Sequence, residues 1–133
     1  MSKENVELVG RLNDVFNERS FLENADLIDP EMVWDMSRIP LPDSALFTGQ
    51  PGFLEFVNAW TESFASERID AEEMIDAADR VVVMVRHSGR GKASGIEIDQ
   101  RFAMVWTLRD SRAIRMDMYP TREEALKAVG LAE

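Results

Sequence analysis

Asp35 is the side chain of this sequence best placed to do chemistry. It lies in a predicted strand over residues 31–37, where neighbouring side chains point to opposite faces. If Asp35 faces an apolar hollow, loss of water raises its pKa and makes it a competent base near neutral pH. We therefore predict Asp35 as the catalytic residue. The alternatives are an ion pair with Arg38 or a position in water at the rim.

His87 is the only histidine, and the sequence contains no cysteine. A lone histidine without a cluster of carboxylates does not build a metal site, and sulfur ligands and disulfides are excluded. We therefore predict neither a metal nor a cofactor. Because His87 adjoins the glycine-rich segment 88–91, the favoured interpretation is an exposed loop residue. A proton shuttle at the mouth of a pocket is the alternative.

Three β-type runs, over residues 80–86, 95–108 and 113–119, must position Asp35. We expect them to form a curved antiparallel sheet whose hollow side is a ligand pocket. Strand alternation assigns these side chains to the hollow together with Asp35: Val82, Met84, Ile98, Gln100, Phe102, Met116 and Met118. Trp60 and Phe64 would close the pocket from a helix over 50–65. Such a pocket suits a small hydrophobic ligand with one polar group.

The remaining segments complete an α+β domain over residues 1–133. The pattern predicts helices over 2–19, 21–28, 50–65 and 122–129, a strand over 67–75, and hairpin loops at 89–91 and 110–112. The opposite sheet face would carry Val81, Val83, Val85, Ala103, Val105 and Tyr119. An apolar face of this kind needs a cover, and a homodimer through it is the simplest one.

Composition excludes several classes of partner. The chain has 133 residues and a formal net charge of −10, so nucleic acid and acidic membrane surfaces would be repelled. No apolar run is long enough to cross a bilayer, and the N-terminus lacks the basic and apolar regions of a signal peptide. We therefore expect a cytoplasmic protein that binds neither nucleic acid nor membrane.

Four segments together resemble a known family. They are DPEMVWD at 29–35, FTGQPG at 47–52, RFAMVWTLRD at 101–110 and MYPTREEA at 118–125. In this order they look like the SnoaL-like branch of the nuclear transport factor 2 and ketosteroid isomerase superfamily. The resemblance implies a cone-shaped, cystatin-like α+β barrel, with a curved antiparallel sheet wrapped around N-terminal helices and a homodimer through the convex face. It also places Asp35 where ketosteroid isomerases have their general base.

Other residues of the family's enzymes have no counterpart here. The isomerase tyrosine of the first helix is missing near Arg11, and its second acid falls near Ile98. The aspartates of limonene-type epoxide hydrolases fall near Val82 and Met118. We therefore predict a small apolar-ligand pocket protein that carries out metal-free acid/base catalysis of isomerase, cyclase or lyase type. The substrate would be a hydrophobic carbonyl or polyketide-like compound, with Asp35 as base. The alternative is a non-catalytic ligand-binding or dimerisation module.

Overall fold

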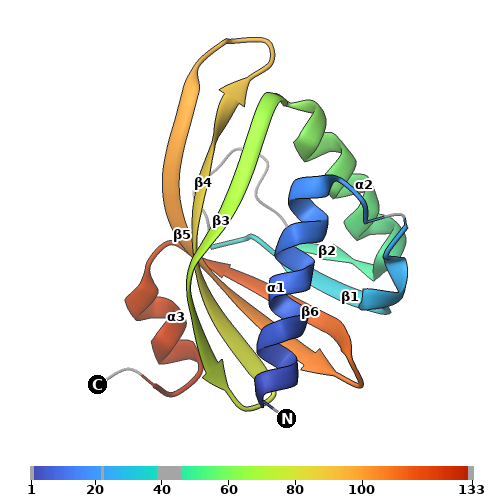
Figure 1. Ribbon diagram of the computed structural model, residues 1–133, viewed down its shortest axis with the longest axis vertical. Coiled ribbons are helices and arrows are strands. Elements are labelled where there is room, and N and C mark those ends of the chain that lie inside the picture. The colour runs from blue at the N-terminus through green and yellow to red at the C-terminus, as the bar shows by residue number, and fades with distance from the viewer. Residues whose placement is uncertain (1, 22, 39–45, 132–133) are drawn as a thin grey trace.

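A curved six-stranded sheet, in the order β2-β1-β6-β5-β4-β3, forms the body of the computed structural model. The structure describes residues 2–21, 23–38 and 46–131. Helices α1 and α2 lie on one side of the sheet and α3 on the other (Figure 1). The two prolines of the segment 38–49 predict a loop there, and most of that segment falls outside the described residues.

The helices and strands follow the predicted order. They are α1 (Ser2–Glu18), the 3-10 turn η1 (Ala25–Leu27), β1 (Ile28–Asp35), β2 (Leu46–Thr48), α2 (Gly49–Glu62), β3 (Phe64–Ala77), β4 (Arg80–Gly91), β5 (Glu97–Arg109), β6 (Arg112–Tyr119) and α3 (Arg122–Ala128). The predicted helix over 21–28 is wrong, because among its described residues, 21 and 23–28, only the three of η1 are helical. Phe21 and Ile28 are both buried on either side of it, so a short turn is enough to connect them.

The sheet is mixed rather than purely antiparallel. Strands β3 to β6 pair as an antiparallel meander, as predicted, but β1 runs parallel to β6. Strand β4 continues to Gly91, so the predicted hairpin loop at 89–91 is wrong and the turn lies between Gly91 and Glu97. Because β4 is longer than predicted, its pairing with β5 is shifted, and this changes which β4 side chains face the concave side of the sheet.

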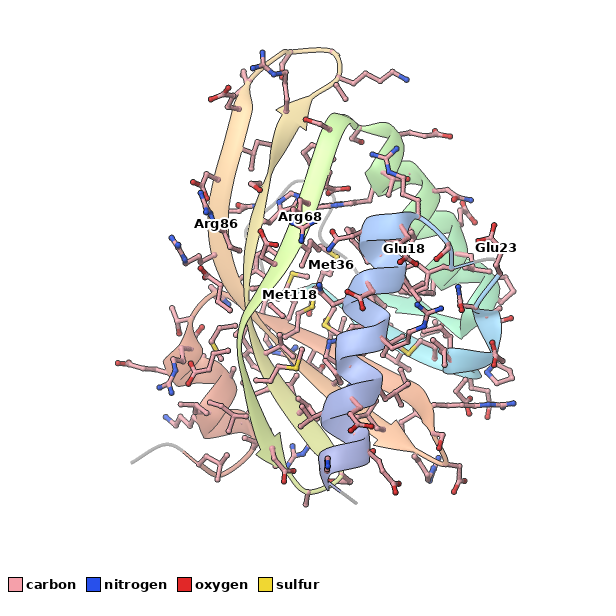
Figure 2. All side chains as sticks on the ribbon, in the orientation of Figure 1. Glu18, Glu23, Met36, Arg68, Arg86 and Met118 are labelled. Carbon is pink, nitrogen blue, oxygen red and sulfur yellow. The ribbon has the colours of Figure 1, made fainter. Side chains whose placement is uncertain are left out.

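The main core fills the concave side of the sheet. Helix α1 contributes Val9, Leu12 and Phe16, whose spacing of three and four residues forms an apolar stripe of helical period. Trp34 of β1 packs against Phe53 of α2, with ring centroids 4.8 Å apart. Figure 2 shows the buried Met36 and Met118 in the interior, whereas Arg86 points away from it.

A second, smaller core lies on the convex face. Val82, Ala103 and Val105 pack there with Ala125 and Leu126 of α3. Thr121 is the N-cap of this helix, and its hydroxyl accepts a hydrogen bond from the Glu124 backbone N–H at 3.2 Å, as expected for the capping pattern Thr121-Arg-Glu-Glu124. The chain's own C-terminal helix therefore covers part of the face assigned to a partner subunit.

Two asparagines of α1 close the free edge of β3. The side chain of Asn17 accepts from the Ile69 N–H at 2.8 Å and donates to its carbonyl oxygen at 2.7 Å. Asn13 donates to the same carbonyl at 3.2 Å. Asn17 thus replaces a neighbouring strand at this point of the edge, where unpaired backbone groups would otherwise remain.

Asn17→Ala is expected to lower the free energy of unfolding by about 1–3 kcal/mol, because the part-buried Ile69 N–H loses its acceptor. Urea denaturation measures this change. Asn5→Ala is the matched control, since Asn5 makes one exposed hydrogen bond to the Ala78 carbonyl. Equal stability losses in the two variants would show that Asn17 has no special role at the edge.

Candidate functional site

Asp35 lies on the convex side of the sheet, away from the main core. It pairs in register with Asp117 of β6, while its neighbours Trp34 and Met36 belong to the concave core. Its carboxylate accepts hydrogen bonds from the Ser37 hydroxyl at 2.6 Å and the Ser37 N–H at 2.9 Å. The prediction that Asp35 faces the apolar hollow is therefore wrong.

The carboxylate of Asp35 belongs to a cluster of two acids and two arginines. Arg115 donates to Asp35 at 3.2 Å and makes two hydrogen bonds to Asp117, at 2.8 and 2.9 Å. Nη1 of Arg38 lies 3.6 Å from Oδ2 of Asp35 and 3.2 Å from Oδ1 of Asp117. The guanidinium carbon of Arg38 lies 4.5 Å from the centroid of the Tyr119 ring. The alternative of a pair with Arg38 is thus what the structure shows.

This cluster stabilises the ionised form of the Asp35 carboxyl group. Burial alone would raise its pKa, but the hydrogen bonds from Ser37 and the charges of Arg38 and Arg115 outweigh burial and hold the pKa below its ordinary value. The expected rise in pKa is wrong. A carboxylate with a lowered pKa is a weak base at neutral pH, and it is engaged with the groups that stabilise its charge.

Asp35→Asn is expected to cost about 1–2 kcal/mol of unfolding free energy at pH 7, because Arg115 and Arg38 lose a charged partner but are themselves partly exposed. Since the folded-state pKa is lowered, this stabilisation is present above the unfolded-state value of about 3.9 and disappears as the pH falls toward the folded value. Urea denaturation of both proteins between pH 7 and 3 measures the difference. A difference in unfolding free energy between wild type and Asp35→Asn that grows as the pH falls would contradict this account.

The predicted pocket residues divide between the two faces. Val82 and Met84 pack on the convex side, so their assignment to the hollow is wrong. Pairing of Val83 with Met104 and of Val85 with Phe102 places the odd-numbered β4 residues on the concave side. The residues that do belong there are Met116 and Met118 in the main core, Trp60 and Phe102 packed against it, and Gln100 in contact with His87. Ile98 is half-buried opposite Gly89, and Phe64 packs edge-on against His87.

His87 is fully buried and hydrogen-bonded at both ring nitrogens. Its Nε2 lies 2.6 Å from Oε2 of Glu67, whose side chain is 2% exposed. Its Nδ1 lies 3.0 Å from Nε2 of Gln100. Trp60 donates its indole N–H to the same Glu67 oxygen. The favoured interpretation of His87 as an exposed loop residue is wrong, because β4 continues past it.

Four elements bring this polar group together. Glu67 comes from β3, His87 from β4, Gln100 from β5 and Trp60 from α2. His87 and Gln100 are direct cross-strand partners, and Glu67 pairs with Gly89. A Cβ at position 89 would lie 2.3 Å from the Ser66 carbonyl oxygen, so glycine is required for the strands to approach here.

The two hydrogen bonds of His87 fit one tautomer of the neutral ring. A carboxylate accepts and the amide nitrogen of Gln100 donates, so in this tautomer Nε2 is the N–H and Nδ1 keeps the lone pair. In this tautomer Nδ1 can take up a proton, and Glu67 stabilises the imidazolium that forms. Aromatic rings enclose the imidazole, with centroids at 5.2 Å for Phe64 and 5.5 Å for Trp60. The arrangement fits proton transfer in a nonpolar setting.

The interior of the concave side is nearly filled. It retains a cavity of about 20 Å³, lined by Val9, Leu12, Asn13, Phe16, Phe21, Trp34, Ile69, Val83, Val85, Met104 and Trp106. These differ from the predicted pocket residues. In the described ranges, the side chains of His, Asp and Glu form no group of three or more able to hold a metal ion. Nor does any helix there have the length and apolarity to span a membrane.

Comparison with known proteins identifies the family of the domain. The sequence matches the model of the SnoaL-like domain over residues 9–116, so the chain belongs to the SnoaL-like domain family. This confirms the resemblance predicted from the four segments. No curated protein matches the sequence.

Solved structures with low sequence identity share the fold. TerC, co-crystallised with polyporic acid, superposes with a TM-score of 0.75 at 21% identity, covering 95% of this chain and 98% of TerC. A ketosteroid isomerase-like protein from Catenulispora acidiphila, in complex with trimethylamine, gives 0.75 at 14%, covering 94% and 93%. A protein with a cystatin-like fold from Xanthomonas campestris gives 0.76 at 12%, covering 96% and 98%. The predicted α+β fold class is confirmed.

Proposed function

We propose that this SnoaL-like domain binds a small hydrophobic carbonyl or polyketide-like compound and moves a proton on it without a metal or cofactor. His87, oriented by Glu67, takes the role that the sequence had suggested for Asp35. The observation that carries the proposal is the buried Glu67–His87 pair on the concave side, with Nε2 and Oε2 2.6 Å apart. Small molecules bound in TerC and in the Catenulispora protein support a ligand site in this fold.

The proposed step is enolisation. Nδ1 of His87 removes a proton from the carbon next to the carbonyl. The electron pair of that C–H bond forms a carbon–carbon double bond, while the π pair of the carbonyl moves to its oxygen and gives the enolate. Glu67 stabilises the resulting imidazolium, which returns the proton to the same or a neighbouring carbon. Gln100 must release Nδ1 for the substrate to reach it, and its freed amide N–H can then donate to the enolate oxygen.

A non-catalytic ligand-binding module remains the second candidate, because a specific observation favours it. His87 has no exposed surface, and Trp60 and Phe64 pack against it. Catalysis therefore needs Gln100 or the aromatic rings to move when a ligand enters. A protein that only binds its ligand would not need access to Nδ1.

Exchange of the carbon-bound protons of 2-tetralone in D₂O, followed by NMR, tests the proposal. The wild-type protein is expected to accelerate exchange above buffer, and His87→Gln to reduce that acceleration by about tenfold or more. Asp35→Asn should leave it unchanged. Acceleration that survives His87→Gln but not Asp35→Asn would return the role of base to Asp35. Binding of 2-tetralone without exchange would favour the non-catalytic module.

A homodimer through the convex face and a cytoplasmic location remain predictions. Helix α3 already covers Val82 and Val105, and the outer parts of β4 and β5 carry ion pairs such as Arg86–Asp99 at 2.7 Å. A dimer would therefore use a polar surface beside α3. Sedimentation velocity at low micromolar concentration tests it, and a single species of monomer mass would exclude a stable dimer.

A further inference from the structure

Trp34 carries a buried donor that the fold leaves unused. The residue is 2% exposed, and its indole Nε1 has no hydrogen-bond partner among the described residues. Its ring is enclosed by those of Phe53, Phe56 and Trp106, with centroids 4.8, 5.6 and 5.7 Å away. Buried N–H groups are nearly always paired, because an unpaired one destabilises the protein. By contrast, Trp60 donates to Glu67.

The same indole lines the cavity of about 20 Å³. That volume is close to the minimum for one water molecule, which also needs two or more polar partners. The cavity lining offers few, because its side chains are apolar apart from the Trp34 indole and Asn13, whose amide already donates to the Ile69 carbonyl. An acceptor oxygen attached to an apolar body suits this surrounding better than a free water molecule.

We propose that Trp34 is a specificity-determining residue that donates its indole N–H to an acceptor oxygen of a hydrophobic ligand. The inference rests on the proposed function, in which a ligand enters the concave hollow. A ketone or ether oxygen would satisfy the donor, whereas a hydrocarbon of the same shape would leave it unpaired. Sites built to hydrogen-bond a ligand group discriminate strongly against analogues that lack it.

The contact lies apart from the His87 group. The rings of Trp60 and Phe56 lie between His87 and Trp34. The distances between ring centroids are 5.5 Å from His87 to Trp60, 5.7 Å from Trp60 to Phe56 and 5.6 Å from Phe56 to Trp34. The oxygen bound by Trp34 is therefore a second polar group, distant from the carbon that meets His87. The ligand class is accordingly a hydrophobic compound with two separated polar groups.

Room for the ligand must come from side chains that move. Met104 lines the cavity, and methionine is unbranched and adapts to irregular shapes. Met104→Ala removes atoms from the lining, leaves Trp34 in place and enlarges the hollow. This variant therefore keeps the inference testable if the wild-type cavity opens too rarely for a probe to enter.

Acetophenone and ethylbenzene test the inference, because they share a carbon skeleton and differ by one oxygen. The chain has three tryptophans, so indole N–H signals in ¹H–¹⁵N NMR are few, and Trp34→Phe identifies the relevant one. Acetophenone is expected to shift the Trp34 signal downfield in wild type or in Met104→Ala. It should bind Trp34→Phe about fivefold or more weakly, while ethylbenzene affinity changes by less than about twofold.

An equal response of the Trp34 signal to both probes would overturn the inference, and so would unchanged acetophenone affinity in Trp34→Phe. If Trp34→Phe does not fold, the test rests on whether acetophenone and ethylbenzene shift the Trp34 signal differently in wild type and in Met104→Ala. A shift of the His87 ring nitrogens without one at Trp34 would overturn this inference and leave the proposed function standing. Binding of neither probe, even by Met104→Ala, would count against both.

Discussion

Glu67→Ala is expected to lower the free energy of unfolding by about 2–6 kcal/mol, because the buried His87 and the half-buried Trp60 lose their shared acceptor at once. The indole N–H of Trp60 and the Nε2–H of His87 both point to Oε2 of Glu67. Each buried donor left without a partner costs about 1–3 kcal/mol. Urea or thermal denaturation measures the change.

Two variants control for this effect. Glu67→Gln keeps a carbonyl oxygen at the position of the carboxylate and should recover much of the lost stability. Glu97→Ala removes an exposed glutamate that pairs with Arg90, and should cost less than about 1 kcal/mol. If Glu67→Ala were as mild as Glu97→Ala, the buried polar group would not be a structural unit.

Phe53→Ala is expected to cost about 3–5 kcal/mol, since it leaves a large cavity where α2 meets the sheet. The side chain is completely buried and lies between Phe21 at 5.1 Å and Trp34 at 4.8 Å, measured between ring centroids. Its removal should also loosen the packing around the Trp34 indole. Chemical denaturation gives the stability change.

The neighbouring Leu54→Ala is the control for Phe53→Ala, because Leu54 lies on the same helix but is only half-buried. We expect it to cost less than half as much. A similar loss in both variants would indicate that helix propensity or fraying of α2, rather than core packing, determines the result.

Local patterns were enough to predict most elements and the fold. The stripe of Val9, Leu12 and Phe16 has helical spacing, and Thr121 caps α3 through a motif only four residues long. Both depend on interactions between near neighbours in the sequence. The order of such elements, with the segments that resemble the SnoaL-like family, then defined the α+β domain.

Sheet faces could not be predicted from local patterns in the same way. Every residue of the run 81–85 is apolar, so alternation does not distinguish its two sides. Which side chains of this run face the core depends on how β4 pairs with β5. That pairing depends in turn on the position of the turn between them, which was predicted at 89–91, whereas β4 continues to Gly91. A shift of one residue exchanges the two faces of a strand. Val82 and Met84 were consequently assigned to the hollow but pack on the convex side, whereas Phe102 does pack against the concave core.

The Glu67–His87 pair was missed because its members are 20 residues apart and meet only through strand pairing. A weak signal did exist. Glu67 alternates with Ile69, a buried residue, which indicates a carboxylate on the apolar face of β3. His87 likewise continues the alternation of Val83 and Val85. Glu67 already lay within the predicted strand over 67–75, whereas His87 could be assigned to a strand only by knowing that β4 extends beyond its predicted run.

The central claim is that the polar centre of this domain is His87 with Glu67, on the concave side, and not Asp35. Because the chain contains one histidine, ¹⁵N NMR of its ring nitrogens in the presence of 2-tetralone tests this directly. We predict an Nε2–H tautomer in the free protein and a change at Nδ1 on addition of the ketone. Unchanged histidine signals, with shifts at the Arg115 side chain beside Asp35, would contradict the account.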